Sequence, residues 1–284
     1  MDLIEPFQRV VVVVLDGLRV DAIDAFALPT LMGLRRNGAY ATAITVEPSV
    51  TWTAMTSLMT GVPAAVHGVV SDSIHLPRPC GVIDPLAATL AERGLPTSAV
   101  LARIPVIFRG VASAIGRKLG VGHLRFVGEG AADILESAHD RLTTQNRGLI
   151  LLHWPDADRA GHEHGWMSPA YAEASMALDR ALAKLLDIVD AHPDTLVIAL
   201  ADHGGGGVNP KDHESDHPHD RLIPLVFVGA GVIPGEIGVH ASLLDVPATI
   251  LWALGVERPS SYQGTPLTGI VSSSRRWVPT TIVA

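Results

Sequence analysis

The sequence predicts a three-layer α/β/α sandwich around a mostly parallel central sheet. Several short runs are rich in Val, Ile and Leu and are continuous rather than alternating, as expected of strands covered on both faces. Helical patterns lie between these runs, and such alternation favours one sheet with helices on both sides. No low-complexity linker divides the chain, so we expect a single domain over residues 1–284.

The expected elements follow one another along the whole chain. Buried parallel strands are expected at 11–15, 98–102, 148–154, 195–201 and 223–229, and helices at 27–38, 84–94, 169–192 and 242–255. Gly38 and Gly94 end two of the helical runs and are expected to be C-caps. We expect a less regular insertion within about 62–147, and the tail 272–284 is either loose or an edge strand.

Composition and charge argue against several classes of protein. The formal net charge of −8 disfavours a nucleic-acid polymer as partner. No apolar run approaches the roughly 20 residues of a membrane span. The apolar run near the N-terminus is short and ends in Asp16, which is not the pattern of a signal peptide. With a single cysteine, Cys80, no intramolecular disulfide can form. We therefore expect a cytoplasmic protein without membrane contact, and the oligomeric state stays open.

Acids and histidines follow three of the expected strands. Asp16 follows 11–15, Asp156 and Asp158 follow 148–154, and Asp202 and His203 follow 195–201. In open α/β sheets ligands bind at the carboxyl ends of the strands. A single such Asp is most simply a turn former, but charges converging from three strands need partners or a cation. Mixed Asp and His ligands suit zinc or manganese. The glycines after His203 predict a mobile backbone beside them.

Hydroxyl groups gather in the segment 47–61, before and within a helix-like run. A hydroxyl at the start of that run could simply cap the helix. Alternatively, the helix N-terminus could bind an anion beside a metal-activated nucleophile. Residue spacing alone leaves Ser49, Thr51 and Thr53 open as that nucleophile.

These residues lie in motifs that resemble those of the alkaline phosphatase superfamily, and most closely its nucleotide pyrophosphatase/phosphodiesterase branch. Five motifs occur in order, and a sixth resembles the family's C-terminal helix and turn. They are VVLDGLRVD (13–21), PSVTWTAMTSLMTGVPAAVHGV (48–69), HWPDADRAGHEHGW (153–166), ADHGGGG (201–207), HESDHPHDRLIPLVFVGAGV (213–232) and LLDVPATILWALGVERPSSYQGTPL (243–267). Each is weak evidence alone, whereas six in the right order are strong evidence.

The resemblance implies a site for two divalent ions, with zinc expected and manganese as the alternative. One ion would be held by Asp16, Thr51, Asp202 and His203, and the other by Asp158, His162 and His213. The family's spacing to the Thr-Gly at the helix end selects Thr51 as nucleophile. Its Asp-x-x-Gly-His pattern selects Asp158 over Asp156 and His162 over His164. A later His-x-x-Asp and Ile-Pro pattern selects His213 over His217 and His219.

The resemblance also implies a function, namely hydrolysis of a small phosphate ester through a phosphothreonine intermediate. Phosphodiesters or nucleotide pyrophosphates are the expected substrates. Trp52 would line one wall of the substrate pocket and His153 and Trp154 the opposite wall, and the alternative for Trp52 is burial in the core. Asp72 stands where the family usually has an asparagine that binds a phosphoryl oxygen. An ionised Asp cannot donate a hydrogen bond, which favours the less charged diester.

Other functions are less well supported by the sequence. A phosphomonoesterase could use the same two-metal site, although only Arg19 and Arg159 lie in the metal motifs as additional positive charge. A phosphomutase of this superfamily usually carries a large cap domain, for which 62–147 is short. Cys80 lacks the C/S-x-P-x-R setting of a sulfatase. A non-catalytic metal-binding protein would be expected to have lost a ligand, whereas all seven expected positions are filled.

Overall fold

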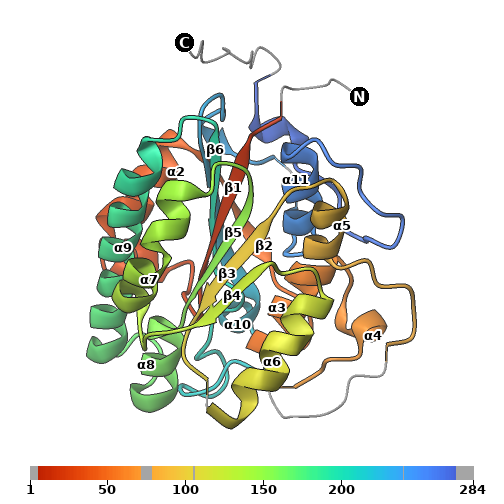
Figure 1. Ribbon diagram of the computed structural model, residues 1–284. Helices are drawn as coiled ribbons and strands as arrows, with labels where there is room; N and C mark the ends of the chain where they lie inside the picture. Colours follow the sequence, from red (N-terminus) through yellow and green to blue (C-terminus); the bar gives the residue numbers. More distant parts are fainter. Residues whose placement is uncertain (1–5, 72–78, 105, 239, 273–284) are drawn as a thin grey trace.

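The computed structural model describes residues 6–71, 79–104, 106–238 and 240–272 (Figure 1). Its strands are β1 (Arg9–Leu15), β2 (Ala39–Ile44), β3 (Thr97–Leu101), β4 (His123–Phe126), β5 (Gly148–Trp154), β6 (Thr195–Leu200), β7 (Leu222–Val228) and β8 (Gly235–Glu236). They form one sheet in the order β4-β3-β5-β1-β6-β7-β2-β8. Neighbours from β4 to β6 are parallel. The tail 273–284 and Asp72 lie outside the described residues.

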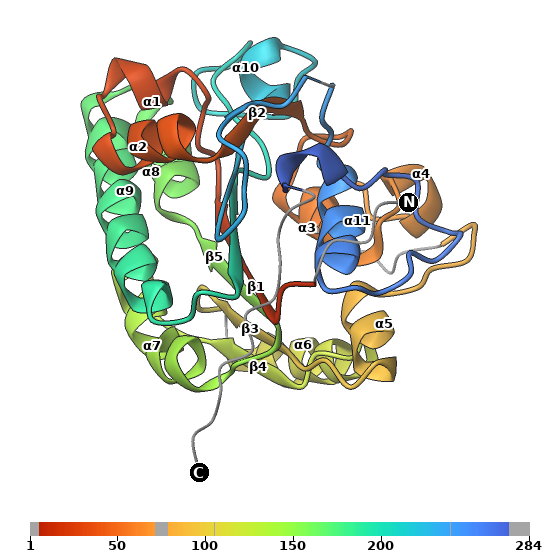
Figure 2. The ribbon, with the colours of Figure 1, turned by 90° about the horizontal axis from the view of Figure 1, so that it is seen from above.

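Helices cover both faces of this sheet. They are α1 (Ala22–Ala25), α2 (Pro29–Asn37), α3 (Thr51–Thr60), α4 (Ala64–His67), α5 (Leu86–Glu92), α6 (Val106–Lys118), α7 (Ala131–Thr144), α8 (Asp156–His164), α9 (Pro169–Asp190), α10 (Pro218–Arg221) and α11 (Asp245–Ala253), with a 3-10 turn at Thr268–Ile270. Helices α2, α7 and α8 pack against α9 on one side, and α3 and α5 pack against α11 on the other (Figure 2). The predicted three-layer α/β/α sandwich is confirmed.

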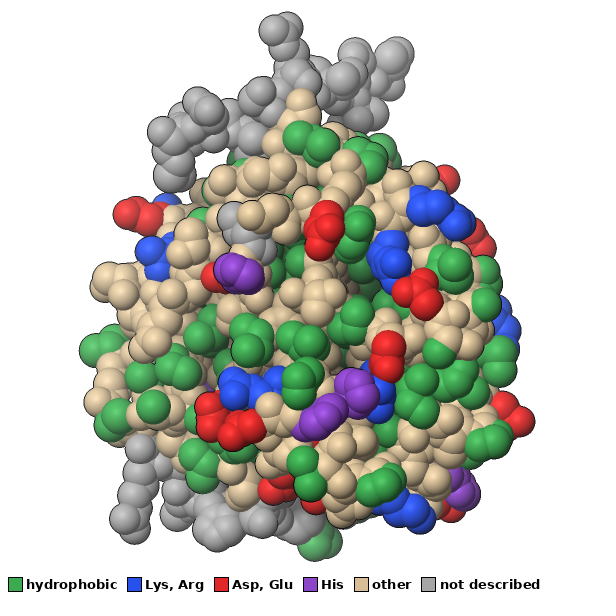
Figure 3. Space-filling model, turned by 180° about the vertical axis from the view of Figure 1, so that it is seen from behind, with side chains coloured by type: hydrophobic (Ala, Val, Ile, Leu, Met, Phe, Trp, Pro, Cys, Tyr) green, Lys and Arg blue, Asp and Glu red, His purple; other side chains and the backbone are tan. Residues whose placement is uncertain are grey.

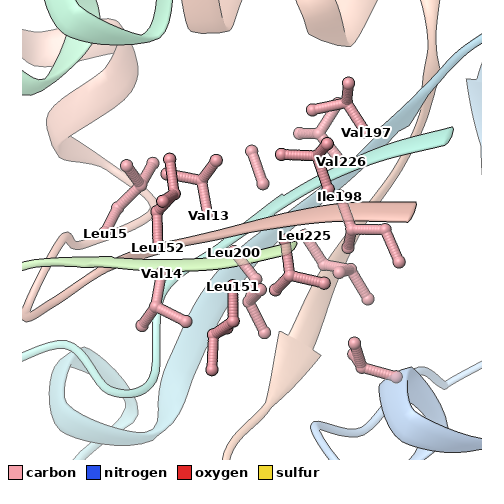
Figure 4. Packing of buried hydrophobic residues seen from close by; sticks show 14 of the residues in the cluster. Val13, Val14, Leu15, Leu151, Leu152, Val197, Ile198, Leu200, Leu225 and Val226 are labelled. Carbon is pink, nitrogen blue, oxygen red and sulfur yellow. The ribbon is translucent and has the colours of Figure 1, made fainter. Parts of the chain in front are cut away.

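The central strands are buried on both faces, which explains their continuous apolar sequences. All seven residues of β1 are buried. Val13 and Leu15 project from one face of β1 and Val14 from the other, so each side chain packs into a core layer (Figure 4). Strand β5 flanks β1 on one side and β6 flanks it on the other. The three strands that carry the predicted metal ligands are therefore adjacent in the sheet.

One expected strand direction is wrong. Strand β7 pairs antiparallel with β6 and with β2, although the run 223–229 was expected to be parallel. Between β6 and β7 the chain makes only a loop and the short α10, without a crossover helix to return it to the amino edge. It therefore enters β7 from the carboxyl edge and runs back. A continuous apolar run reports burial on both faces, not strand direction.

Most of the segment 62–147, where we expected a less regular insertion, forms regular elements. Strands β3 and β4 extend the main sheet, and α5, α6 and α7 accompany them. Before α5, the described residues of this segment without a helix or strand are 62–63, 68–71 and 79–85.

The two glycines expected to be C-caps behave differently. Gly94 adopts the left-handed conformation of a C-cap, with a φ of +67°, as predicted. Gly38 is extended, with a φ of −122°. A Cβ atom on Gly38 would lie 2.4 Å from the Phe227 carbonyl oxygen. Gly38 is the C-cap of α2, as expected, and its N–H donates to the Leu34 carbonyl, but the close approach of β7 rather than a left-handed conformation is what requires a glycine there.

The face of the molecule opposite to that in Figure 1 carries mixed charges. On the face shown in Figure 3, acidic and basic side chains are interspersed and do not form a patch of one sign. Among the helices of the described residues, none is both long and apolar enough to cross a bilayer.

Candidate metal centre

Two groups of acidic and histidine side chains meet at the carboxyl edge of the three central strands. Asp16 directly follows β1, and Asp202 and His203 follow β6. Asp158 lies in the first turn of α8, which begins after β5. The groups are Asp16, Asp202 and His203, and Asp158, His203 and His213, in each of which one ligand atom per residue lies within 4.8 Å of the others. They are two candidate metal-binding triads that share His203.

The first triad is buried and contacts Thr51. His203 Nε2 lies 3.3 Å from Asp16 Oδ1 and 3.7 Å from Asp202 Oδ2. Thr51 Oγ1 lies 3.0 Å from His203 Nε2 and 3.5 Å from Asp16 Oδ1. The Asp202 carboxylate also accepts the backbone N–H groups of Gly17 and His203. These bonds fix the carboxylate while leaving its Oδ2 atom without a hydrogen-bond partner in the described structure.

His162 lies next to the second triad and contacts two of its residues. Asp158 Oδ1 lies 3.4 Å from His162 Nε2 and 3.8 Å from His213 Nε2. The Nε2 atoms of His162 and His213 are 3.2 Å apart. The rings of His203 and His213 stack with their centroids 3.8 Å apart. All seven residues that the resemblance assigned to metal binding are thus brought together.

The chemistry of this donor set fits divalent ions. The Nδ1 atoms of all three histidines face backbone carbonyl oxygens at 2.6–2.9 Å, those of His162, His203 and His213 facing Lys211, Gly204 and Ser49 respectively. In the neutral ring Nδ1 therefore carries the proton and Nε2 presents a lone pair, the usual arrangement of a metal-ligating histidine. Two such lone pairs 3.2 Å apart repel one another unless a cation lies near them. The Oδ1 atom of Asp158 is also buried without a hydrogen bond.

The pKa values of the three carboxylates also indicate that a positive charge would stabilise their ionised forms. Burial and the neighbouring Asp16 carboxylate raise the pKa of Asp158 to about 8, and the same two causes raise that of Asp202 to about 6. Burial opposes ionisation of Asp16 as well, but His153 and His203 outweigh it and lower its pKa to about 2. Within the described residues, the ion pairs of these three carboxylates are all with histidines. Divalent ions would allow all three carboxylates to ionise together.

His153 supports Asp16 from within the fold. It was expected on a wall of the substrate pocket, but its side chain is only 13% exposed, and its Nε2 lies 3.2 Å from Asp16 Oδ2. Burial lowers the pKa of His153, but Asp16 outweighs it and the net direction is upward. The structure thus places His153 behind a candidate metal ligand, and Trp154, which was expected on the same wall, is fully buried. No sequence signal identifies the pair of His153 and Asp16, because it depends on the register of β1 against β5.

The flanking residues of the metal motifs have other contacts. Asp156 Oδ2 accepts the Ala131 N–H at the start of α7, 2.9 Å away, and so caps that helix. His164 is exposed beside Glu163. His217 and His219 form a ring pair in and before α10 and belong to neither triad.

Of the three candidate hydroxyls, only that of Thr51 faces the cluster. The Ser49 hydroxyl donates to the His213 carbonyl, and the Thr53 hydroxyl donates to the Val69 carbonyl. Thr51 is the first residue of α3, and the side chain of Val50, the N-cap residue, forms no capping hydrogen bond. The positive end of the helix is therefore directed at the space beside Thr51, which suits a phosphoryl group. Trp52 is 54% exposed, so burial in the core is wrong for it.

The tetraglycine after His203 is firmly held, contrary to the mobile backbone expected from its sequence. All four of its N–H groups donate hydrogen bonds of 2.8–2.9 Å, with the acceptors Asp220 O, His219 O, Asp212 O and Asp220 Oδ1 in chain order. A Cβ atom on any of the four would lie 2.6 Å or less from a neighbouring atom. Glycine is needed here for close packing. Gly206 is the one of the four with a positive φ, +74°.

The fold and the two triads together define an alkaline phosphatase-like protein. Murine ectonucleotide pyrophosphatase/phosphodiesterase 5, solved as an inactive threonine variant with AMP, has a TM-score of 0.72 at 14% identity, with 93% of this chain and 100% of that chain covered. A mutant of the alkaline phosphatase PafA has a TM-score of 0.71 at 12% identity, with coverages of 95% and 100%. At these identities the likeness shows the fold.

Sequence comparison gives the family. The family described as type I phosphodiesterase/nucleotide pyrophosphatase matches residues 10–80 and 118–231, more than half of the chain. The chain belongs to this family, which confirms the resemblance seen in the motifs. A phosphopentomutase of Anaeromyxobacter sp. (strain K) is 33% identical over 172 residues, 59% of this chain and 39% of that protein. A 2,3-bisphosphoglycerate-independent phosphoglycerate mutase of Wolbachia pipientis wMel is 27% identical over 146 residues, 50% and 28% respectively. The aligned part is less than half of each relative.

Two surface hollows lie elsewhere on the molecule. One, of about 610 Å³, is lined by residues of β8 and the 3-10 turn, and the other, of about 650 Å³, by residues around α5 and 256–260. Neither is lined by a residue of the triads. We place the chemistry at the triads because buried, unpaired ligand atoms occur there.

His67, in the motif that follows α3, is a structural histidine. Its Nδ1 accepts the Val69 N–H at 3.1 Å, so in the neutral ring Nε2 carries the proton and faces Ser57 Oγ at 2.9 Å. Ser57 thus receives a hydrogen bond and is not activated as a nucleophile. Burial lowers the pKa of His67 to about 4.

This shift predicts a loss of stability in acid. Between pH 6.5 and 4 the unfolded chain protonates at His67 whereas the folded protein does not, so falling pH favours unfolding. Glutamine at this position does not titrate. The free energy of unfolding of the wild type minus that of His67→Gln should therefore shrink by up to about 3 kcal/mol over this window. Urea unfolding of both metal-free proteins measures it, and a difference that is independent of pH would contradict the prediction.

Proposed function

We propose that the chain is a metal-dependent hydrolase of phosphodiesters or nucleotide pyrophosphates with Thr51 as its nucleophile. One observation carries the proposal: the Thr51 hydroxyl lies within 3.5 Å of both His203 Nε2 and Asp16 Oδ1, at the N-terminus of a helix without a side-chain cap. A nucleophile, a cation site and a site for phosphoryl oxygens thus coincide. Membership of the type I phosphodiesterase family supports the reaction class.

The reaction that we propose has two steps. Thr51 Oγ1 gives up its proton and forms a bond to phosphorus while the bond from phosphorus to the leaving-group oxygen breaks, and the leaving oxygen takes up a proton. Water then hydrolyses the phosphothreonine ester, which releases the phosphate product and restores the hydroxyl. The N-terminal turn of α3 would bind the phosphoryl oxygens in both steps. Asp16, Asp202 and His203 would hold one divalent ion and Asp158, His162 and His213 the other. Such ions lower the pKa of a bound hydroxyl and stabilise the attacking and leaving oxygens.

Zinc is the metal that we propose, with manganese as the alternative. Three of the six donors besides Thr51 are imidazoles, and this share of nitrogen suits zinc or manganese better than magnesium or calcium.

The charges near the site support a diester over a monoester. Arg19 is buried, and its guanidinium is already engaged by the Asp21 carboxylate and the Gly205 carbonyl. Arg159 is exposed on α8. Neither is a free buried cation of the kind that would bind the extra charge of a monoester. AMP binds to the structurally similar murine protein, and this supports a nucleotide as one product.

A hydrolysis panel tests this proposal. The metal-loaded protein is assayed with aryl and nucleotide phosphodiesters, a dinucleoside pyrophosphate and the matching monoesters. We expect a higher kcat/KM for diesters or pyrophosphates than for monoesters. Preference for monoesters would overturn the substrate assignment, and no hydrolysis of any ester with metal bound would overturn the proposed activity.

Phosphoryl transfer on monoesters is a second candidate, favoured by the phosphopentomutase among the sequence relatives. A mutase would isomerise a sugar phosphate without net release of phosphate. Adding pentose phosphates to the panel, with product identification as well as phosphate release, separates the two candidates. Isomerisation without hydrolysis would favour the mutase.

Trp52 gives a prediction about specificity. Its ring follows the nucleophile directly in α3 and is more than half exposed. Stacking on a flat leaving group is worth about 1–3 kcal/mol. We expect Trp52→Ala to raise KM for aryl or nucleotide diesters about tenfold or more while changing KM for methyl diesters little. Steady-state kinetics on both substrates measures this, and an equal change for both would remove Trp52 from the substrate pocket.

A further inference from the structure

The glycines around the candidate metal centre converge on one side chain, that of Trp166. A Cβ atom on Gly161, Gly205 or Gly206 would lie 2.1–2.6 Å from atoms of Trp166. Gly161 belongs to α8, whereas Gly205 and Gly206 belong to the loop after His203. The indole is therefore clamped between the element that carries Asp158 and His162 and the loop that leads from His203 to His213. Trp166 is only 6% exposed.

Trp166 also bonds to the segment that carries Asp16. Its Nε1–H donates to the Gly17 carbonyl at 2.9 Å. The Gly17 N–H in turn donates to Asp202 Oδ1 at 3.3 Å. A single peptide segment thus connects the indole with two ligands of the first triad. Tyr171 Oη donates to the same Gly17 carbonyl at 2.9 Å, so this oxygen is held by two buried donors.

The ring of Trp166 also packs on two residues of the second half-site, by which we mean Asp158, His162 and His213, the residues proposed to hold the second ion. Its centroid lies 5.2 Å from that of His162 and 5.9 Å from that of His213, with both rings edge-on. Edge-to-face contact restricts how a histidine ring can turn about its own hydrogen bond. Trp166 therefore contacts ligands of the second half-site directly and holds the first through Gly17.

We propose that Trp166 is a positioning residue that couples the two halves of the metal centre. Its N–H group fixes the Gly17 segment behind Asp16 and Asp202, and its ring fixes the orientation of His162 and His213. This inference rests on the proposed metal centre. Trp166 touches no reacting atom in this role and acts through the ligands.

Metal affinity, measured without substrate, tests the coupling. Trp166→Phe keeps an aromatic ring but removes the N–H donor, and we expect the affinities for Zn²⁺ and Mn²⁺ to fall about 10–100-fold, as on loss of other groups that orient ligands. Competition with a chelator measures the affinities. Trp154→Phe is the matched control, because Trp154 is fully buried but its Nε1 has no hydrogen-bond partner in the described structure. Its metal affinity should stay within about twofold of wild type.

Fluorescence gives a second readout, which reports whether metal binds beside Trp166. Because Trp166 lies beside His162 and His213, metal binding should change the tryptophan emission of the wild type and of Trp154→Phe. The same addition should change the emission of Trp166→Phe much less. Thermal unfolding of the metal-free proteins checks that each variant folds. If both variants lose stability but only Trp166→Phe loses affinity, positioning is supported.

Tyr171→Phe extends the test to the shared carbonyl. The effects of Trp166→Phe and Tyr171→Phe on metal affinity should not add in the double variant, because both remove donors from Gly17 O. Unchanged affinity in Trp166→Phe, with wild-type protein binding metal, would overturn this inference alone. Failure of the wild type to bind either metal would instead overturn the proposed metal centre.

Discussion

Thr51→Ala should reduce kcat for diester hydrolysis by at least about three orders of magnitude, which corresponds to a loss of about 4 kcal/mol of transition-state stabilisation. The substitution removes the oxygen that would bond to phosphorus, and the remaining site can act only through a water molecule in its place. The six other candidate ligands and the backbone of α3 stay in position. We therefore expect the fold and most of the metal affinity to be retained, which elemental analysis and circular dichroism would show.

Thr53→Ala is the matched control for this variant. Thr53 lies two residues further along the same helix, is fully buried, and donates its hydroxyl to the Val69 carbonyl. Its loss should lower stability and leave the rate within about tenfold of wild type, or about 1.4 kcal/mol. Activity of Thr51→Ala within the same tenfold range would show that another group is the nucleophile.

Asp158→Asn should remove one of two bound ions per chain. Asparagine keeps the size of the side chain but lacks the negative charge, and Asp158 is the one carboxylate of the second half-site. We expect metal content to fall from about two ions to about one, and kcat/KM for diesters to fall at least about a hundredfold. Elemental analysis after metal loading and gel filtration measures the stoichiometry. A wild-type content below about one ion per chain would count against the metal centre itself.

The neighbouring Asp156 provides the control. It lies two residues away on the same helix but bonds to the N-terminus of α7. Asp156→Asn should therefore keep both ions and most of the activity. Asparagine keeps an oxygen that can accept the Ala131 N–H and caps helices about as well as aspartate, so the melting temperature should change little. Equal metal loss in both variants would show that Asp156 contributes to metal binding as much as Asp158 does.

Local sequence was sufficient for the central strands and for part of the site. The expected runs 148–154 and 195–201 match β5 and β6 within one residue, because a strand buried on both faces is continuously apolar. Strand β2 was missed because its buried residues alternate with more exposed ones, and β4 was missed because it is short and half-exposed. The antiparallel direction of β7 is set by the connection between β6 and β7, and the amino-acid composition of β7 does not indicate it.

Site residues show the same division. Asp16, Asp202 and His203 lie within three residues of the strand before them, so the rule for strand ends finds them. His162 and His213 could be chosen from their histidine-rich surroundings only through the family resemblance, since their neighbours have the same chemistry. The pairing of His153 with Asp16 and the packing of glycines on Trp166 join segments far apart in the chain. Such contacts form only once the strands are aligned, so no local sequence pattern predicts them.

The hydrogen-bonded tetraglycine has a consequence for the kinetics of metal uptake. His203 and His213 stand at the two ends of a loop whose glycine N–H groups are all bonded to protein acceptors. Its conformational entropy is lost when the chain folds, so binding an ion need not order this loop. The metal-free protein then already presents both histidines at their final separation. Association of each ion should accordingly proceed at a rate proportional to the concentration of metal ion, without a concentration-independent phase that reports closure of the loop.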